Sequence, residues 1–232
     1  MTSELEKFEK KLGLSFKDKA LFTRAFTHRS YLNEHKKQGL ENNERLEFLG
    51  DAVLELVITH FLYLKFPDRA EGDLTSYRAA LVNTINLGRI ATELGINEYL
   101  LLSKGEAKDI GRARSIILAD TIEALIGAIY LDLGYDEASK FITKYVLGMS
   151  DIDLIVKNKL WLDAKSRFQE RAQEESGITP SYKLVRETGP DHDKQFTIGV
   201  FIGKSQVATG TGPSKQEAEQ AAAEKGLESK GW

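Results

Sequence analysis

The sequence predicts an all-α domain followed by a small α+β domain with the element order α-β-β-β-α. Apolar residues recur at helical spacing up to about residue 148, and this half carries no strand signal. After about Lys159 the pattern becomes a helix, three short segments rich in β-branched and aromatic residues, and a second helix. We therefore expect domains at 1–150 and 161–232, joined by a linker at 151–160.

Glycine and proline mark the ends of the helices expected in the first domain, because glycine favours the left-handed cap and proline cannot continue a helix. The expected helices are an N-terminal one that ends at Gly13, an amphipathic segment at 17–34, a long helix from Asn43 to Phe66 stopped by Pro67, a helix from Gly72 to Gly95, one at 111–134 and one at 135–148. The polar stretch at 35–43 is expected to be a loop.

The second domain is expected to be a three-stranded sheet between two helices. The segments 181–188, 194–203 and 205–212 alternate or carry β-branched and aromatic residues between turn signals. Helices are expected at 161–176 and at 214–231, the latter with four alanines between Ala218 and Ala223.

Composition excludes several classes of protein. The 232 residues suffice for one or two domains, and the lack of cysteine excludes a disulfide framework and any thiolate metal site or nucleophile. The charged N-terminus lacks the apolar core of a secretory signal, and no stretch approaches the roughly 20 apolar residues of a membrane span. We expect a cytoplasmic protein without a membrane partner. The net charge of −3 argues against a generic nucleic-acid binder, which is usually basic.

Two unusual groups of acidic residues occupy the apolar helices. In "NERLEFLGD" (43–51), Glu44, Glu47 and Asp51 fall on one face, although like charges at these intervals repel. In "ILADTIEALIGAIYLD", Asp120 and Glu123 repeat the spacing of three. An exposed polar face is the alternative to a metal site. The scarcity of other polar positions and the repetition of the pattern support the metal site, and spacing alone leaves both interpretations open.

A cation between the two helices would explain both groups, because an unpaired buried carboxylate costs several kcal/mol. Carboxylates are ligands for hard divalent ions, which makes Mg²⁺ the expected ion and Mn²⁺ its substitute. Such ions activate water and stabilise the leaving oxygen in phosphodiester hydrolysis. A metal site here would make the first domain a metal-dependent nuclease or phosphotransferase.

These stretches resemble the ribonuclease III family. "NERLEFLGD" matches the signature of that family in full, and "ILADTIEALIGAIYLD" resembles its second acidic motif. "FTHRSYLNE" (26–34) and "EGDLTSYRAALVN" (71–83) resemble its flanking motifs in the right order. "DAKSRFQE", "GPDH" and "GTGPSKQEAEQAAA" in the second half resemble a double-stranded-RNA-binding domain. The resemblance spans nearly the whole chain.

The resemblance implies roles for individual residues of the first domain. Glu47, Asp51, Asp120 and Glu123 match the catalytic carboxylates that bind the metal. Glu44 and Glu71 match acidic positions that line the cleavage valley. Phe48 matches an aromatic residue that plugs into the partner of a homodimer, whereas the sequence alone favours an ordinary core residue there. His28 and Arg29 receive no role, and a structural histidine is the default for position 28.

In the second domain the resemblance implies three sites of RNA contact. The first helix offers polar side chains suited to 2′-hydroxyl groups in the minor groove, the "GPDH" turn offers a histidine, and the start of the last helix offers a phosphate site. The residues are Ser166, Gln169, Glu170, Gln173, His192, Ser214 and Lys215. The family usually carries two adjacent basic residues where Lys215 is followed by Gln216 and Glu217. Residues 161–232 hold ten Lys or Arg and eleven Asp or Glu, which suggests weak affinity of the isolated domain.

The resemblance implies an endoribonuclease that cuts both strands of double-stranded RNA with Mg²⁺ and leaves a 5′-phosphate, a 3′-hydroxyl and a short 3′ overhang. Ribosomal and other precursor RNAs are the substrates that it implies. Two cuts need two sites, which a symmetric homodimer supplies. The alternatives are a double-stranded-RNA-binding regulator without cleavage, and a helical phosphohydrolase of small molecules, which the second domain disfavours.

Overall fold

The computed structural model describes residues 2–35, 40–108, 111–157, 163–190 and 194–232. Contacts divide the chain into two compact units, Met1–Val156 and Lys157–Trp232, which are described separately below. The expected linker at 151–160 contains a short helix, α9 (Ile152–Lys157), most of which falls within the first unit.

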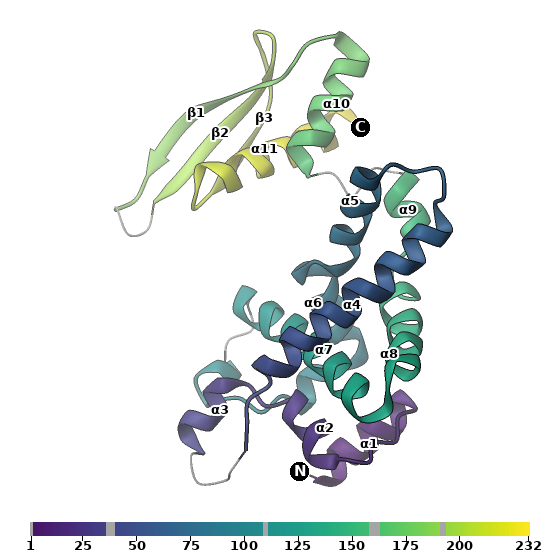
Figure 1. The fold of residues 1–232 in the computed structure, drawn as a ribbon. Helices are drawn as coiled ribbons and strands as arrows, with labels where there is room; N and C mark the ends of the chain where they lie inside the picture. Colours follow the sequence, from purple (N-terminus) through teal and green to yellow (C-terminus); the bar gives the residue numbers. More distant parts are fainter. Residues whose placement is uncertain (1, 36–39, 109–110, 158–162, 191–193) are drawn as a thin grey trace. The chain divides into compact units, whose positions relative to one another are not determined.

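The first unit is helical, as the periodicity predicts (Figure 1). Its helices are α1 (Thr2–Leu12), α2 (Lys19–Ala25), α3 (Arg29–Glu34), α4 (Glu44–Lys65), α5 (Glu71–Val82), α6 (Thr84–Leu94), α7 (Arg112–Leu133), α8 (Tyr135–Phe141) and α9, with a π-helical turn at Ile142–Leu147 and 3₁₀ turns at Ile96–Tyr99 and Glu106–Lys108.

The long helices α4 and α7 pack against each other and carry much of the core of this unit. Leu54 and Ile58 of α4 and Ile122, Leu125 and Ile126 of α7 are fully buried. Burying such side chains contributes about 1.5–3 kcal/mol each relative to exposure. The apolar stretches that surround the acidic residues in the sequence therefore fix two rigid helices side by side, and the acidic residues are placed by that packing.

Three of the expected helices are interrupted. The segment 17–34 breaks after Ala25, where Thr27 forms a parallel bridge with Leu101 and the ring of His28 caps α3 by accepting from the Ser30 amide. The expected Gly72–Gly95 helix breaks at Asn83, whose side chain caps α6 by accepting from the Asn86 amide at 2.8 Å. The last helix changes to a π-turn after Phe141. Each break exchanges helical hydrogen bonds for other partners.

The second unit has the expected order α10 (Ala164–Ser176), β1 (Ser181–Thr188), β2 (Gln195–Ile202), β3 (Ser205–Gly212) and α11 (Lys215–Lys230). Its strands form one antiparallel sheet in the order β1-β2-β3, and Figure 1 shows the two helices lying together beside it. Phe168 of α10, Val200 of β2 and Leu227 of α11 share one core. A Cβ on Gly210 would lie 2.1 Å from the Ala222 amide nitrogen, so β3 and α11 touch backbone to backbone.

Within the described residues, the helices all fall short of the combined length and apolarity that crossing a membrane requires.

Candidate metal centre

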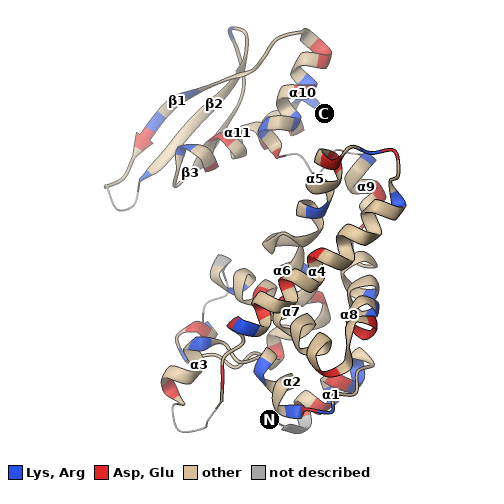
Figure 2. Cartoon of the chain, in the orientation of Figure 1, with Lys and Arg blue, Asp and Glu red and all other residues tan. Residues whose placement is uncertain are grey.

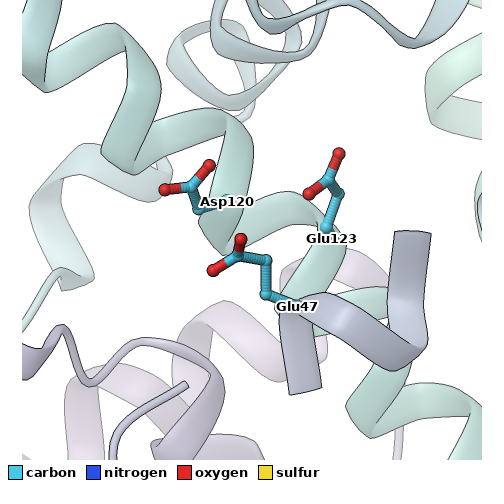
Figure 3. Close-up of side chains that lie close together, drawn as sticks. All are labelled: Glu47, Asp120 and Glu123. Atoms are coloured by element: carbon cyan, nitrogen blue, oxygen red, sulfur yellow. The ribbon is translucent and has the colours of Figure 1, made fainter. Parts of the chain in front are cut away.

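Three acidic side chains converge where α4 crosses α7. Glu47 extends from the first turns of α4, and Asp120 and Glu123 extend from the middle of α7 (Figure 3). Each offers a carboxylate oxygen, and the three oxygens lie within 4.8 Å of one another. Oxygens that share one octahedral Mg²⁺ lie roughly 3–4 Å apart, since each Mg–O bond is about 2.1 Å. The cluster is therefore close to the size that a metal ion needs.

Burial and mutual repulsion make these carboxylates hard to ionise without a cation. Burial, with the charges of Asp51, Asp120 and Glu47 added to it, raises the pKa of Glu123 to about 8. Burial and the neighbouring charges of Asp120, Glu44 and Asp51 raise the pKa of Glu47 to about 7. Burial also raises the pKa of Asp120. All three side chains are partly exposed, so solvent and an ion can reach them.

Asp51 lies one helical turn after Glu47 on α4, outside the group of three. Burial and the charge of Glu55 raise its pKa, and the nearby Arg78 opposes that shift. The charge of Asp51 is nevertheless the largest of those that raise the pKa of Glu123. The structure thus gathers three of the four expected metal ligands and leaves Asp51 exposed beside them.

A pocket of about 470 Å³ opens next to the cluster. Its lining includes His28, Arg29, Glu44, Glu47 and Asp120. The guanidinium of Arg29 lies 3.6 Å from the Glu44 carboxylate, and both side chains are exposed. Figure 2 shows the acidic segments of α4 and α7 in the middle of the unit. Acidic side chains outnumber basic ones in this lining, so a substrate that enters here meets mostly negative charge.

The other expected residues of the first unit lie elsewhere. Glu71 begins α5 and lines a different pocket, of about 490 Å³, with Tyr63, Arg69 and Arg78. Phe48 is 81% exposed on α4, so the sequence-based preference for a core residue at this position is wrong. An exposed phenylalanine of this kind is the sort of side chain that protein interfaces bury.

In the second unit the expected RNA-contacting residues of α10 share one face. Ser166, Gln169, Glu170 and Gln173 follow helical spacing opposite the buried Phe168. The Ser166 hydroxyl donates to Asp163 at 2.8 Å, and the Gln173 amide donates to Thr179 at 3.2 Å. The buried residues of α10 lie on the opposite side of the helix, so this polar face is open to a ligand.

The start of α11 is an exposed helix N-terminus. The Ser214 hydroxyl caps it by accepting from the Glu217 amide at 3.2 Å. The exposed Lys215 ammonium lies 5.9 Å from the centre of the Phe196 ring. His192 falls outside the described residues.

Sequence reasoning did not single out Gly50 and Gly127, which lie where α4 touches α7. The glycines in "FLGD" and "LIGA" were available signals, because glycine inside a long helix often marks close approach of another backbone.

The two units define a class of protein: a helical unit with a carboxylate cluster suited to a metal, joined to an α-β-β-β-α module. Comparison with known proteins gives the family. Residues 18–149 match the family described as Ribonuclease-III-like, and residues 164–230 match the double-stranded RNA binding motif. The chain belongs to the ribonuclease III family and is an endoribonuclease of that family.

Individual relatives agree along nearly the whole chain. Ribonuclease 3 of Pelotomaculum thermopropionicum is 45% identical over 97% of this chain and 92% of its own length. Ribonuclease 3 of Borreliella burgdorferi is 44% identical over 97% of this chain and 91% of its own. A solved nuclease domain of ribonuclease III from Campylobacter jejuni, described as flexible in a region involved in dimer formation, is 43% identical with a TM-score of 0.56 and covers 62% of this chain and 96% of its own.

Proposed function

We propose that this endoribonuclease binds Mg²⁺, or Mn²⁺ in its place, at the acidic cluster and cuts both strands of double-stranded RNA as a homodimer. The observation that carries the proposal is the convergence of Glu47, Asp120 and Glu123 within 4.8 Å. Cleavage would leave a 5′-phosphate, a 3′-hydroxyl and a short 3′ overhang. Precursor RNAs, including ribosomal ones, are the proposed substrates, and the cytoplasm is the proposed location.

The donor set fits a hard divalent ion. Oxygen is the only ligand atom that the three clustered side chains offer, and Asp51 is proposed as a fourth ligand or as the holder of a coordinated water. When bound, such an ion supplies an activated water and neutralises the charge on the phosphate. The protein side chains hold the ion, and their raised pKa values mean that binding it displaces protons.

The residues around the cluster are proposed to position the RNA. Arg29 is the basic side chain in the pocket lining and stands at its exposed rim, where it can offset the repulsion between phosphate and Glu44. We propose that Glu44 and Glu71 line the cleavage valley. They line different pockets in one chain, so the proposed valley would combine Glu44 of one subunit with Glu71 of the other.

The dimer is proposed to form through the first unit. The exposed Phe48 side chain is the proposed anchor, and a two-fold axis would use it twice. The pocket of about 490 Å³ that Glu71, Arg69 and Arg78 line is the proposed acceptor, because Leu62, Tyr63 and Leu74 give part of its lining an apolar surface for the ring. Two cuts on opposite RNA strands then come from two symmetry-related acidic clusters.

The second unit is proposed to hold the duplex by its shape. Ser166, Gln169, Glu170 and Gln173 on α10 face a minor groove, and Ser214 and Lys215 at the start of α11 face a phosphate. His192 is proposed as a further residue that contacts the RNA.

Membership of an endoribonuclease family counts against the alternative of a regulator that binds double-stranded RNA without cutting it. One assay separates the two functions: labelled long duplex RNA is incubated with the protein in Mg²⁺ and in chelator. Shortening to duplex fragments in Mg²⁺ alone supports the nuclease. A gel shift with intact RNA in both conditions supports the regulator and overturns the nuclease.

A further inference from the structure

Two glycines form a reciprocal contact directly beneath the acidic cluster. A Cβ added to Gly50 of α4 would lie 1.7 Å from the carbonyl oxygen of Glu123, and one added to Gly127 of α7 would lie 2.2 Å from the carbonyl oxygen of Leu46. The same two positions would put each Cβ about 3 Å from the other glycine's amide nitrogen, at 2.8 and 3.1 Å. The two backbones therefore meet with no side chain between them.

The atoms in this contact belong to the metal-binding segments themselves. The carbonyl that Gly50 touches is that of Glu123, and the carbonyl that Gly127 touches belongs to Leu46, the residue before Glu47. The distance between the two backbones at this point therefore sets the separation of the backbone positions from which the Glu47 and Glu123 side chains extend. Ordinary van der Waals contact starts at 3.4 Å. The atoms that a methyl group at Gly127 would meet are backbone atoms of Leu46 and Gly50, which cannot rotate away, so the methyl group must push α4 and α7 apart by about 1 Å.

We propose that the Gly50–Gly127 contact is a spacer that fits the carboxylate cluster to a small divalent ion, so that it determines which metal the site prefers. Mg²⁺ requires oxygens at about 2.0–2.1 Å in near-octahedral geometry, whereas Ca²⁺ accepts about 2.3–2.6 Å and flexible coordination. A site assembled from two helices meets the stricter demand only when the helices are held close. The inference rests on the proposed function, because it assumes that the cluster holds an ion.

The chain supplies matched controls for the test variant Gly127→Ala. A Cβ on Gly88 of α6 would lie 2.5 Å from the Ser115 hydroxyl and 2.9 Å from its carbonyl oxygen, so Gly88→Ala also strains a helix contact with α7, but not the contact between α4 and α7. A Cβ on Gly72 of α5 would meet nothing within 4 Å, so Gly72→Ala adds a methyl group without strain. If Gly127→Ala changed metal binding only by lowering stability, Gly88→Ala would change it in the same way. If it acted only by raising helix propensity, Gly72→Ala would have the same effect.

The measurement is the affinity of the full-length protein for Mg²⁺ and for Ca²⁺, each titrated alone by calorimetry without RNA. Gly127→Ala should weaken Mg²⁺ binding by about tenfold or more and Ca²⁺ binding by about threefold or less, so the ratio of the two constants shifts. Gly88→Ala and Gly72→Ala should leave that ratio at the wild-type value. An unchanged ratio in Gly127→Ala overturns the spacer, while wild-type protein that binds neither ion overturns the proposed function instead.

A second variant covers the chance that the contact matters only for folding. In Gly127→Ala, the substitution Asp120→Glu adds a methylene to the shorter ligand and should recover about threefold in Mg²⁺ affinity, although the same substitution weakens the wild-type site. Failure of this rescue in folded protein contradicts the spacer. If Gly127→Ala does not fold in either ion, as judged by circular dichroism, the contact serves stability alone and the proposal is overturned.

Discussion

Glu47 on α4 and Glu123 on α7 bring carboxylate oxygens to within 4.8 Å of each other across the contact between two long helices. Both carry a raised pKa, because burial and neighbouring acidic groups disfavour their charged forms. Apolar packing fixes the two helices, so the backbone positions from which these side chains extend stay close together. A cluster of this kind is suited to a cation, which would relieve the repulsion between its carboxylates.

The metal-free protein should lose stability as the pH rises. Glu47 and Glu123 bind protons more tightly in the folded state than in the unfolded state, where their pKa has the ordinary value of 4.5. Between about pH 4.5 and 8 the folded state therefore holds more protons than the unfolded state. The melting temperature in chelator should therefore fall across that window, and less steeply in Glu123→Gln. Identical slopes for wild type and variant would contradict the raised pKa. The stabilisation by added Mg²⁺ should grow with pH, because fewer protons compete.

Replacing Phe48 should break the dimer. Loss of an exposed phenylalanine that becomes buried on association costs about 1.5–3 kcal/mol per site, and a two-fold dimer uses the site twice. Sedimentation of full-length Phe48→Ala should show dissociation constants raised by about two orders of magnitude or more. Leu154→Ala on α9 removes another exposed apolar side chain and serves as the control. A wild-type protein that is monomeric at micromolar concentration, or a variant that dimerises normally, would refute the interface.

The second unit should contribute more to the affinity for duplex RNA than to the cleavage reaction. Truncation after Val156, at the boundary between the compact units, should weaken binding of duplex RNA yet leave cleavage at low salt. All the clustered carboxylates precede that boundary. A folded truncation that fails to cut at every salt concentration, in Mg²⁺ and in Mn²⁺, would show that the division of labour is wrong.

Binding of RNA should depend only weakly on salt, because few basic residues are available to neutralise phosphates. Lys215→Ala should lower the slope of log affinity against log salt by about 1, as expected for one phosphate contact. Lys225→Ala changes an exposed lysine further along the same helix and should leave the slope unchanged. A slope that responds equally to both substitutions would remove the assigned role of Lys215.

Local sequence patterns predicted the elements that depend on local chemistry. The bounds of β1 and β3 match the predicted segments, and α4 ends just before the predicted stop at Phe66. The break between α2 and α3 escaped prediction because Thr27 pairs with Leu101, a partner that no local pattern reveals. The break at Asn83 carried a readable signal, since asparagine is a favoured helix cap.

Helix spacing and family resemblance together predicted the acidic residues of the site, but not their arrangement. Spacing placed Glu47 and Asp51 on one face of α4, but only the crossing of α4 and α7 decides which of them joins Asp120 and Glu123 in the group within 4.8 Å. The exposure of Phe48 could not be judged from an apolar helix, because the sequence does not say which face of that helix the rest of the unit leaves uncovered. The close approach at Gly50 and Gly127 likewise depends on tertiary packing.

The measurement that tests the central claim most directly pairs duplex-RNA affinity with single-turnover cleavage for wild type and Glu123→Gln in Mg²⁺. The amide keeps the size of the side chain and removes the charge that helps hold the ion, so cleavage should fall by orders of magnitude while folding, dimerisation and RNA affinity stay near wild type. The effects of Glu47, Asp51 and Asp120 substitutions should not add to it, because the residues act as one site. Near-normal cleavage by Glu123→Gln would contradict the claim that the two apolar helices carry their acidic residues in order to hold a catalytic metal.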